Sequence, residues 1–330
     1  MDSAPVAAAA PEPRGWLTAL GAVVSLLALA AVLWWASRQE APTLPTSGPR
    51  LLALAAAVLL YFAACAVRGE RWLALLRHNG AVPRRADAYA LVAVGYMGNN
   101  VLPARAGDAL RVFFLAPRAH TGARTVIGTL LAERLLDVAV LAVAFILLAS
   151  IAVGGAGLPS GERLVALAGL MAALAAATAA VALVLHRRDR LVAVWAALAP
   201  MAAATRRLRG RHGAAMLAVT LAVWGLEAGV WWTCGEAAGL DLDAVEAGYL
   251  LSLASMFALV PSGPGYAGTM DAAVIFGARV LGRGASATLS YLLLLRFVLF
   301  VPITLAGLGV LVLRYGGLAR LRAARAHTAA

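Results

Sequence analysis

The stretch GYMGNNVLPARAGDALR, Gly95–Arg111, decides how this chain folds. It places two asparagines, a proline, an aspartate and two arginines between two apolar arms. Proline lacks an amide donor and glycine adopts unusual dihedral angles, so a helix is expected to break here. The backbone groups that the break frees need polar partners, because lipid offers none. An ordinary loop between two helices is the simpler alternative.

The composition is that of an integral membrane protein. Of 330 residues, 62% are hydrophobic and 13% are charged, which is too apolar for a soluble globular protein of this length. Six apolar runs are long enough to cross a hydrocarbon core of about 30 Å as helices, the third continuing a helix that begins near Gly122. These predicted spans are Trp16–Ala36, Leu51–Val67, Leu136–Val153, Leu164–Leu185, Ala214–Cys234 and Ala285–Leu313.

The positions of the arginines predict the orientation. The net charge of +12 is concentrated beside the apolar runs, and arginines there mark the cytoplasmic side, so nucleic acid is not an expected partner. We expect residues 68–85, 187–211 and 314–325 to be cytoplasmic, and with them both termini, in a bacterial inner membrane. Arg68 and Arg71 belong to the first of these regions. The segment Gly69–Gly80 is expected to lie on the inner surface as an amphipathic helix.

Two polar-interrupted regions, Ala86–Leu135 and Ala247–Gly284, must each start and end on one side of the membrane for the neighbouring spans to fit. If both crossed fully, the basic loop Arg187–Arg211 would lie outside, against the positive-inside rule. The predicted fold is therefore an all-α polytopic helical membrane protein. It has six full spans plus two oppositely oriented re-entrant hairpins in an inverted-repeat arrangement.

This plan treats residues 1–330 as a single membrane domain with two halves. The first half is 1–153, with a hairpin near 86–118, and the inverted second half is 164–313, with a hairpin near 247–283. Residues 314–330 form a basic cytoplasmic tail. In transporters of this plan, broken helices meet near the bilayer midplane and form the substrate site.

The first hairpin turn carries candidate headgroup residues. Arg105 and Arg111 flank Asp108, and two arginines for one aspartate leave a positive charge that could hold a phosphate in a bidentate contact. The alternative is that Arg105 and Asp108 only neutralise each other at the turn. The other residues assigned to this turn are Asn99 and Asn100, which offer donors and acceptors, and the helix breakers Pro103 and Gly107.

The second turn, VPSGPGYAGTMD, has the same plan of helix breakers followed by an acid, Asp271, near the next helix start. Its apolar flanking arms favour a buried turn over an ordinary loop. The residues assigned to this turn and its gating are Pro261, Gly263, Pro264, Gly265, Tyr266, Gly268 and Asp271.

Charges inside the spans need partners or a wet cavity. Glu133 and Asp137 are four residues apart and share a helix face with room for Arg134 beside them. We interpret them as part of the same site or its gate, or as an ion-pair network that locks the first hairpin to the third span.

Arg296 lies deep in the last span, too far from either end to reach water easily. Asp271, Glu227 or a bound phosphate could neutralise it. A pair between Glu227 and Arg296 is the structural alternative to headgroup binding. No catalytic motif, metal-ligand spacing or cofactor site is predicted, and Cys65 and Cys234 are expected to pack rather than to form a disulfide.

Four motifs in order, NNVLPARAGDALR, AERLLD, PSGPGYAGTMD and LLLLRFVLFVP, resemble the lysylphosphatidylglycerol synthase transmembrane-domain family of flippase-like membrane proteins. The resemblance covers about Leu51 to Leu313. In bifunctional members a soluble domain follows that transfers an aminoacyl group from tRNA to phosphatidylglycerol. The sequence ends at Ala330, so we expect a stand-alone member without that domain. Asp271 departs from the family pattern, in which glutamate is common.

The resemblance implies lipid translocation rather than lipid synthesis. We therefore expect flippase-like or scramblase-like movement of an anionic lipid, glycerophospholipid or polyprenyl-phosphate-linked, with Arg105, Arg111 and Arg296 at the headgroup. An enzyme is not expected. Two rivals stay open: a non-transporting membrane partner of a lipid-modifying or glycosyl-transferring enzyme, and a membrane-embedded lipid transferase with Asp108, Asp137 or Asp271 as general base.

Overall fold

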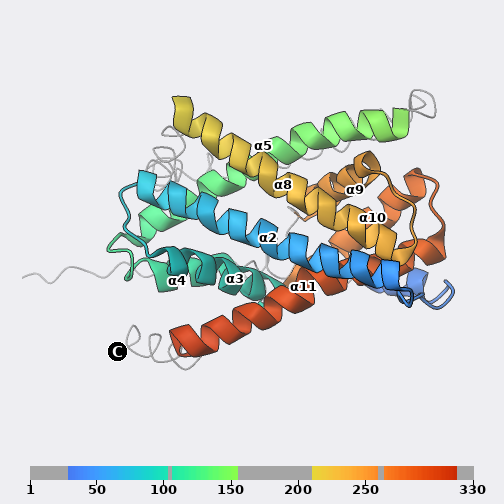
Figure 1. The fold of residues 1–330 in the computed structure, drawn as a ribbon, viewed down its shortest axis with the longest axis horizontal. Helices are drawn as coiled ribbons and strands as arrows, with labels where there is room; N and C mark the ends of the chain where they lie inside the picture. The colour runs from blue at the N-terminus through green and yellow to red at the C-terminus, as the bar shows by residue number, and fades with distance from the viewer. Residues whose placement is uncertain (1–28, 103–105, 155–209, 259–263, 318–330) are drawn as a thin grey trace, which may run out of the picture.

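The computed structural model describes residues 29–102, 106–154, 210–258 and 264–317, and every regular element in these ranges is helical (Figure 1). Four helices are long and apolar enough to span a membrane. They are α2 (Gly48–His78), α5 (Ala123–Gly154), α8 (Gly210–Ala238) and α11 (Ala285–Tyr315). Most of the first predicted span and all of Leu164–Leu185 lie outside the described residues.

Helix α2 runs further than the sequence predicted. It begins beside Pro49, a residue suited to the first turn because its missing amide has no partner there anyway. It continues without a break to His78, and Gly69, Arg71 and Trp72 are buried within it. The prediction of a separate surface helix at Gly69–Gly80 is therefore wrong, because this segment is the buried end of a span.

The polar-interrupted regions are pairs of shorter helices. The first pair is α3 (Arg85–Val101) and α4 (Ala106–Leu115). The second is α9 (Ala244–Phe257) and α10 (Thr269–Val280), with the short 3₁₀ helix η2 (Pro264–Tyr266) between them. The predicted helix breaks are thus confirmed. The start of α5 at Ala123 likewise agrees with the helix expected from near Gly122.

Each pair folds back on itself as a hairpin. A Cβ atom on Gly107 would overlap the carbonyl oxygen of Gly95, so α4 returns along α3 at a distance that only glycine permits. In the second pair, Gly277 lies against the side-chain ends of Leu250 and Leu253 rather than against backbone. Glycine therefore sets a close backbone approach in the first hairpin, and a contact with side chains in the second.

The two hairpins lie at opposite ends of the bundle (Figure 1). Helices α2 and α8 pack side by side in opposite directions, and α3–α4 lies at the left end while α9–α10 lies at the right. The first arm of each hairpin packs against a long helix from the other part of the chain, α3 on α11 and α9 on α5. The turns of both hairpins consequently point toward the middle of the bundle.

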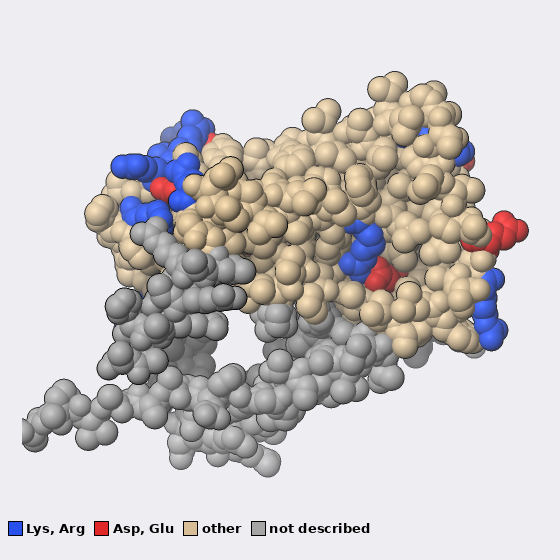
Figure 2. Space-filling model, turned by 90° about the horizontal axis from the view of Figure 1, so that it is seen from below, with Lys and Arg blue, Asp and Glu red and all other residues tan. Residues whose placement is uncertain are grey.

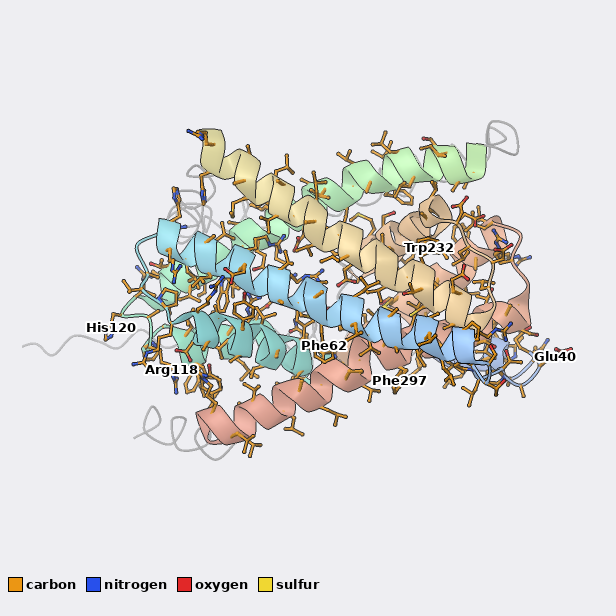
Figure 3. The ribbon with its side chains drawn as sticks, in the orientation of Figure 1. Glu40, Phe62, Arg118, His120, Trp232 and Phe297 are labelled. Atoms are coloured by element: carbon orange, nitrogen blue, oxygen red, sulfur yellow. The ribbon has the colours of Figure 1, made fainter. Side chains whose placement is uncertain are left out.

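Most charged side chains of the described surface lie at the two ends of the bundle, and apolar side chains lie between these ends. Figure 2 shows a largely uncharged lower face with most of its charged residues at the ends. In Figure 3, Arg118 and His120 lie at one end and Glu40 at the other, with the half-exposed rings of Phe62, Trp232 and Phe297 between. Arginines outnumber acids at the α3–α4 end, where the described charges are Glu70, Arg77, Arg84, Arg85, Asp87, Arg118, Arg124, Arg211 and Arg314.

Candidate functional site

A network of ion pairs, most of them buried, joins four helices beside the first hairpin. Helix α2 contributes arginines, α4 and α5 each contribute both signs, and α8 contributes an acid. The network consists of Arg68, Arg71, Arg111 and Arg134 with Asp108, Glu133, Asp137 and Glu227. Its charges balance, as burial in a low-dielectric surrounding requires.

The centre of this network is the pair of Arg71 and Asp137. The guanidinium donates to both carboxylate oxygens, at 2.6 and 3.1 Å, and to the Thr220 hydroxyl at 3.0 Å. Trp224 donates its indole N–H to the same carboxylate at 3.1 Å. Because bidentate charge-assisted bonds are among the strongest in proteins, this pair fixes α2, α5 and α8 relative to one another.

Arg68 pairs with Glu227 at 2.6 Å, both groups being buried. Its guanidinium also lies over the rings of Tyr96 and Trp224, at 5.6 and 5.2 Å from their centroids. The hypothesis of a Glu227–Arg296 pair is therefore wrong. The predicted end of the span at Val67 is wrong too, because α2 continues past Arg68 and Arg71 and turns both toward acids on α8 and α5.

Arg111 is enclosed rather than available. Only 3% of its side chain is exposed, and it contacts Glu133 at 3.2 Å and Asp108 at 3.4 Å. Its guanidinium lies 4.0 Å from the ring centroid of Trp72, a distance typical of a cation–π contact. The sequence placed two arginines beside one aspartate at this turn. In the structure Glu133 of α5 neutralises one of them, Arg111.

Arg134 is the most loosely held arginine of the network. Its shortest contacts to carboxylates are 3.4 Å to Asp108 and 3.7 Å to Asp137, and its side chain is 30% exposed. The Asp108 side chain is 27% exposed, and its shortest contact with an arginine of the described residues is 3.4 Å. The predicted ion-pair network between the first hairpin and α5 is therefore present. Its shortest contact to Asp108 on α4 is longer than its shortest contact to each of the other acids.

The second turn is held by Arg296. This arginine donates to Asp271 and to the carbonyl of Gly265, each at 2.6 Å, and to the carbonyl of Tyr266 at 3.3 Å. Asp271 also accepts from the amide of Gly268 at 2.8 Å. Of the partners considered for Arg296, Asp271 is the one observed. Gly265 and Gly268 both have positive φ, 64° and 85°, which explains the glycines here.

The two hairpin turns meet on the middle of α11. The Asn100 amide donates to the Thr304 hydroxyl at 2.9 Å. Gly265 lies against the ring of Phe300 and the carbonyl of Asn100. Residues that are far apart in sequence, at the tips of two oppositely placed hairpins, therefore share one contact region.

A cavity of about 160 Å³ opens beside this contact region, and we call it the central cavity. Both turns line it, through Asn99 and Tyr266, and it reaches Arg134, Trp231 and the Arg68–Glu227 pair. The side-chain oxygen of Asn99 and the indole N–H of Trp231 are buried and have no hydrogen-bond partner within the described ranges. Neither atom is accessible to a water-sized group, so the polar character of the cavity comes from the charged and amide side chains on its lining, which suit a polar ligand group.

The structure brings six of the residues that the sequence singled out to one cavity, but the predicted headgroup residues Arg111 and Arg296 are not on its lining. Asn99, Asn100, Arg134, Asp137, Glu227 and Tyr266 line the central cavity, whereas Pro264 is exposed. The sequence missed Arg68, Arg71 and the aromatic residues around them. The sequence could have shown that they belong to the span, because no helix breaker separates these arginines from the apolar run before them. Four predicted residues, Pro103, Arg105, Pro261 and Gly263, lie outside the described residues.

Comparison with known proteins supports the resemblance found in the motifs. The family model described as the lysylphosphatidylglycerol synthase TM region matches residues 18–307. The chain is also similar to glycosyltransferase AglD of Haloferax volcanii, at 29% identity over 123 residues, which is 37% of this chain and 19% of that protein. The match thus spans about a fifth of that relative. No solved structure gives a significant match.

Proposed function

Because this chain belongs to the lysylphosphatidylglycerol synthase transmembrane region family, we propose that it moves an anionic lipid between the leaflets of a bacterial inner membrane. The lipid is a glycerophospholipid or a polyprenyl-phosphate-linked molecule. The observation that carries the proposal is the central cavity. It is lined by charged and amide side chains, among them Arg134 and Asn100, at the place where two helix breaks meet. Broken helices around a buried polar site are typical of transporters.

The lengths of the hairpin arms support a re-entrant topology. With ten residues in α4 and 12 in α10, the returning arms measure about 15 and 18 Å at 1.5 Å per residue. A hydrocarbon core is about 30 Å thick. We propose that both hairpins enter and leave on the same side, from opposite faces. The arginine-rich end, with both termini, would be cytoplasmic.

The packing of the long helices supports an inverted repeat. Helix α2, the α3–α4 hairpin and α5 follow one another in the same order as α8, the α9–α10 hairpin and α11. The two sets run in opposite directions (Figure 1). The first hairpin arm of each set packs against the last long helix of the other set. In this proposal the site lies on the axis between the halves, as in other inverted-repeat transporters.

Translocation requires the hairpins to rearrange. Arg111 and Arg296 are both held by carboxylates, so a phosphate at either position would have to replace an acid. Arg105 stays a predicted headgroup residue. The lipid's polar group would pass through the central cavity while its chains stay in apolar surroundings.

Leaflet exchange tests the proposal. Purified protein would be reconstituted in liposomes with labelled phosphatidylglycerol, other glycerophospholipids or a polyprenyl phosphate, with and without an ion gradient. We expect fast exchange of at least one anionic lipid, and loss of exchange in Arg105→Ala and Arg296→Ala variants that remain folded. Absence of exchange for every lipid under both conditions would contradict the proposal.

The similarity to a glycosyltransferase favours one alternative, a non-transporting membrane partner of a glycosyl-transferring or lipid-modifying enzyme. Co-purification of such an enzyme, with function surviving Arg105→Ala and Arg296→Ala, would support it. A membrane transferase would instead need a free carboxylate as base, and Asp137 and Asp271 each hold an arginine at 2.6 Å. Chemical turnover of a lipid that Asp108→Asn abolishes would favour that function.

A further inference from the structure

A large apolar groove lies between α4 and α5, next to the central cavity. Its volume is about 1000 Å³, and its described lining is mostly hydrocarbon, including Val112, Phe113, Ile127 and Leu131. We call it the α4–α5 groove. The charged residues on its lining are Asp108, Arg118 and Arg134. Such a space suits a hydrocarbon chain far better than a polar molecule.

Arg134 lies at the junction of the two spaces. It lines the central cavity on one side and the α4–α5 groove on the other. Asp108, which lies 3.4 Å from it, lines the groove. A single loose ion pair therefore stands where a polar cavity and an apolar groove adjoin. That order of polar space, cation and apolar space matches the order of headgroup, phosphate and chain in a phospholipid.

The size of the central cavity limits the headgroup. An engineered protein cavity of about 150 Å³ holds one benzene molecule, which has six heavy atoms. The central cavity, at about 160 Å³, therefore has room for a group of that size, such as glycerol. An oligosaccharide would not fit without a large expansion.

On the premise of the proposed lipid translocation, we propose that this protein binds an anionic glycerophospholipid with a small headgroup across the Arg134 junction. The phosphate takes the place of Asp108 on Arg134. The headgroup occupies the central cavity near Asn99 and Trp231, and one acyl chain lies in the α4–α5 groove.

The geometry assigns the phosphate to Arg134 rather than to the other arginines of the network. Arg68 and Arg71 hold their acids at 2.6 Å, and no more than 5% of either side chain is exposed. Among the described residues the shortest contact of Arg134 to a carboxylate is 3.4 Å, and its side chain is 30% exposed. Exchange of Asp108 for a phosphate at Arg134 thus breaks a 3.4 Å contact between two partly exposed groups, and such contacts are weak.

The chain position is tested with a phosphatidylglycerol that carries a diazirine at the end of one acyl chain. The full-length protein in nanodiscs is irradiated, and the labelled residues are mapped by mass spectrometry. We expect label on the groove residues of α4 and α5. Ile127→Trp fills the groove and should lower this label about tenfold, the loss expected when a buried chain is excluded.

Ile146→Trp is the matched control. Ile127 and Ile146 are both exposed isoleucines of α5, 37% and 60% respectively, but only Ile127 lines the groove. The control should leave the labelling of the groove unchanged. Equal labelling of the two variants, or label confined to the Ile146 region in the unmodified protein, would overturn the assignment of the chain.

Opposite effects of two substitutions test the phosphate position. Arg134→Gln removes the cation and should weaken retention of phosphatidylglycerol in native mass spectrometry by about tenfold. Asp108→Asn removes the competing anion and should strengthen retention. Arg134→Lys keeps the positive charge and should retain more phosphatidylglycerol than Arg134→Gln does. If the Gln and Asn variants weaken retention equally while remaining folded, the pair is only structural and the proposal is wrong.

Competition tests the headgroup. Unlabelled phosphatidylglycerol should displace the photoactivatable lipid, whereas a polyprenyl diphosphate carrying an oligosaccharide should not. Equal displacement by both would overturn the small-headgroup assignment. These measurements do not depend on transport: binding at the junction without leaflet exchange would leave the site standing and remove the translocation, and exchange with label elsewhere would do the reverse.

Discussion

The two hairpins share a sequence plan but differ in how their acids are held. In the second hairpin, Asp271 accepts from Arg296 at 2.6 Å and from the Gly268 amide at 2.8 Å. In the first, Asp108 has two arginine neighbours, and the nearest nitrogen of each is 3.4 Å away. One acid is locked between its own turn and α11, whereas the other is shared and partly exposed.

This difference suggests that one hairpin is fixed in the bundle and the other can move. The locked turn of α9–α10 ties α11 to the middle of the bundle through three hydrogen bonds from Arg296. The loosely held α4 lies between the central cavity and the α4–α5 groove. A short bond to a buried charge is costly to break, and a long contact to a half-exposed one is not. We expect α4 to move and α10 to stay fixed.

The largest effect should come from the Arg71–Asp137 pair, which fixes the long helices α2, α5 and α8 relative to one another. Asp137→Ala leaves Arg71 buried without its bidentate partner, which should destabilise the protein by about 3–5 kcal/mol. Thermal unfolding in detergent measures this, with the exposed Arg84→Ala as control. A shift no larger than that of the control would show that this pair does not hold α2, α5 and α8 together.

The two acids can be compared directly by the same substitution. Asp271→Asn weakens a buried charged hydrogen bond and should cost about 1.5–3 kcal/mol. Asp108→Asn affects a partly exposed pair and should cost less than about 1 kcal/mol. Parallel unfolding curves check the ranking. Equal costs would remove the distinction between a locked and a loose hairpin.

The close approach of the first hairpin's arms should also be measurable. Gly107→Ala places a methyl group into the backbone of α3 and should destabilise the protein by about 1–3 kcal/mol, as overpacking does. Gly309→Ala is the control, since a Cβ on Gly309 meets no atom within 4 Å. If Gly107→Ala is as stable as its control, the arms do not pack closely.

The placement of the hairpins at opposite faces has a test with almost no expected effect on stability. Single cysteines replace Gly122 or Gly284, where a Cβ meets no atom within 4 Å, after Cys65 and Cys234 are changed to alanine. In intact cells an impermeant thiol reagent should label Gly284→Cys from outside and leave Gly122→Cys unlabelled. Labelling of Gly122→Cys would contradict the re-entrant topology of the first hairpin.

Local features of the fold were predictable from the sequence. The breaks after Val101 and Phe257 follow from proline and glycine, which cannot continue a helix without cost. The long helices follow from apolar runs, although α2 extends well past the predicted Val67 because Arg68 and Arg71 were taken as the end of the span. Four ordered motifs were enough to identify the family that residues 18–307 match.

The sequence by itself determined where the chain is apolar, where its helices break and which residues carry charge, because these depend on single residues and near neighbours. Only the tertiary structure decided which charges pair. Arg71 and Asp137 are 66 positions apart, and Arg68 and Glu227 are 159 apart. A buried charge accepts any suitably placed partner, so the choice of Asp271 over Glu227 for Arg296 came from how the helices pack.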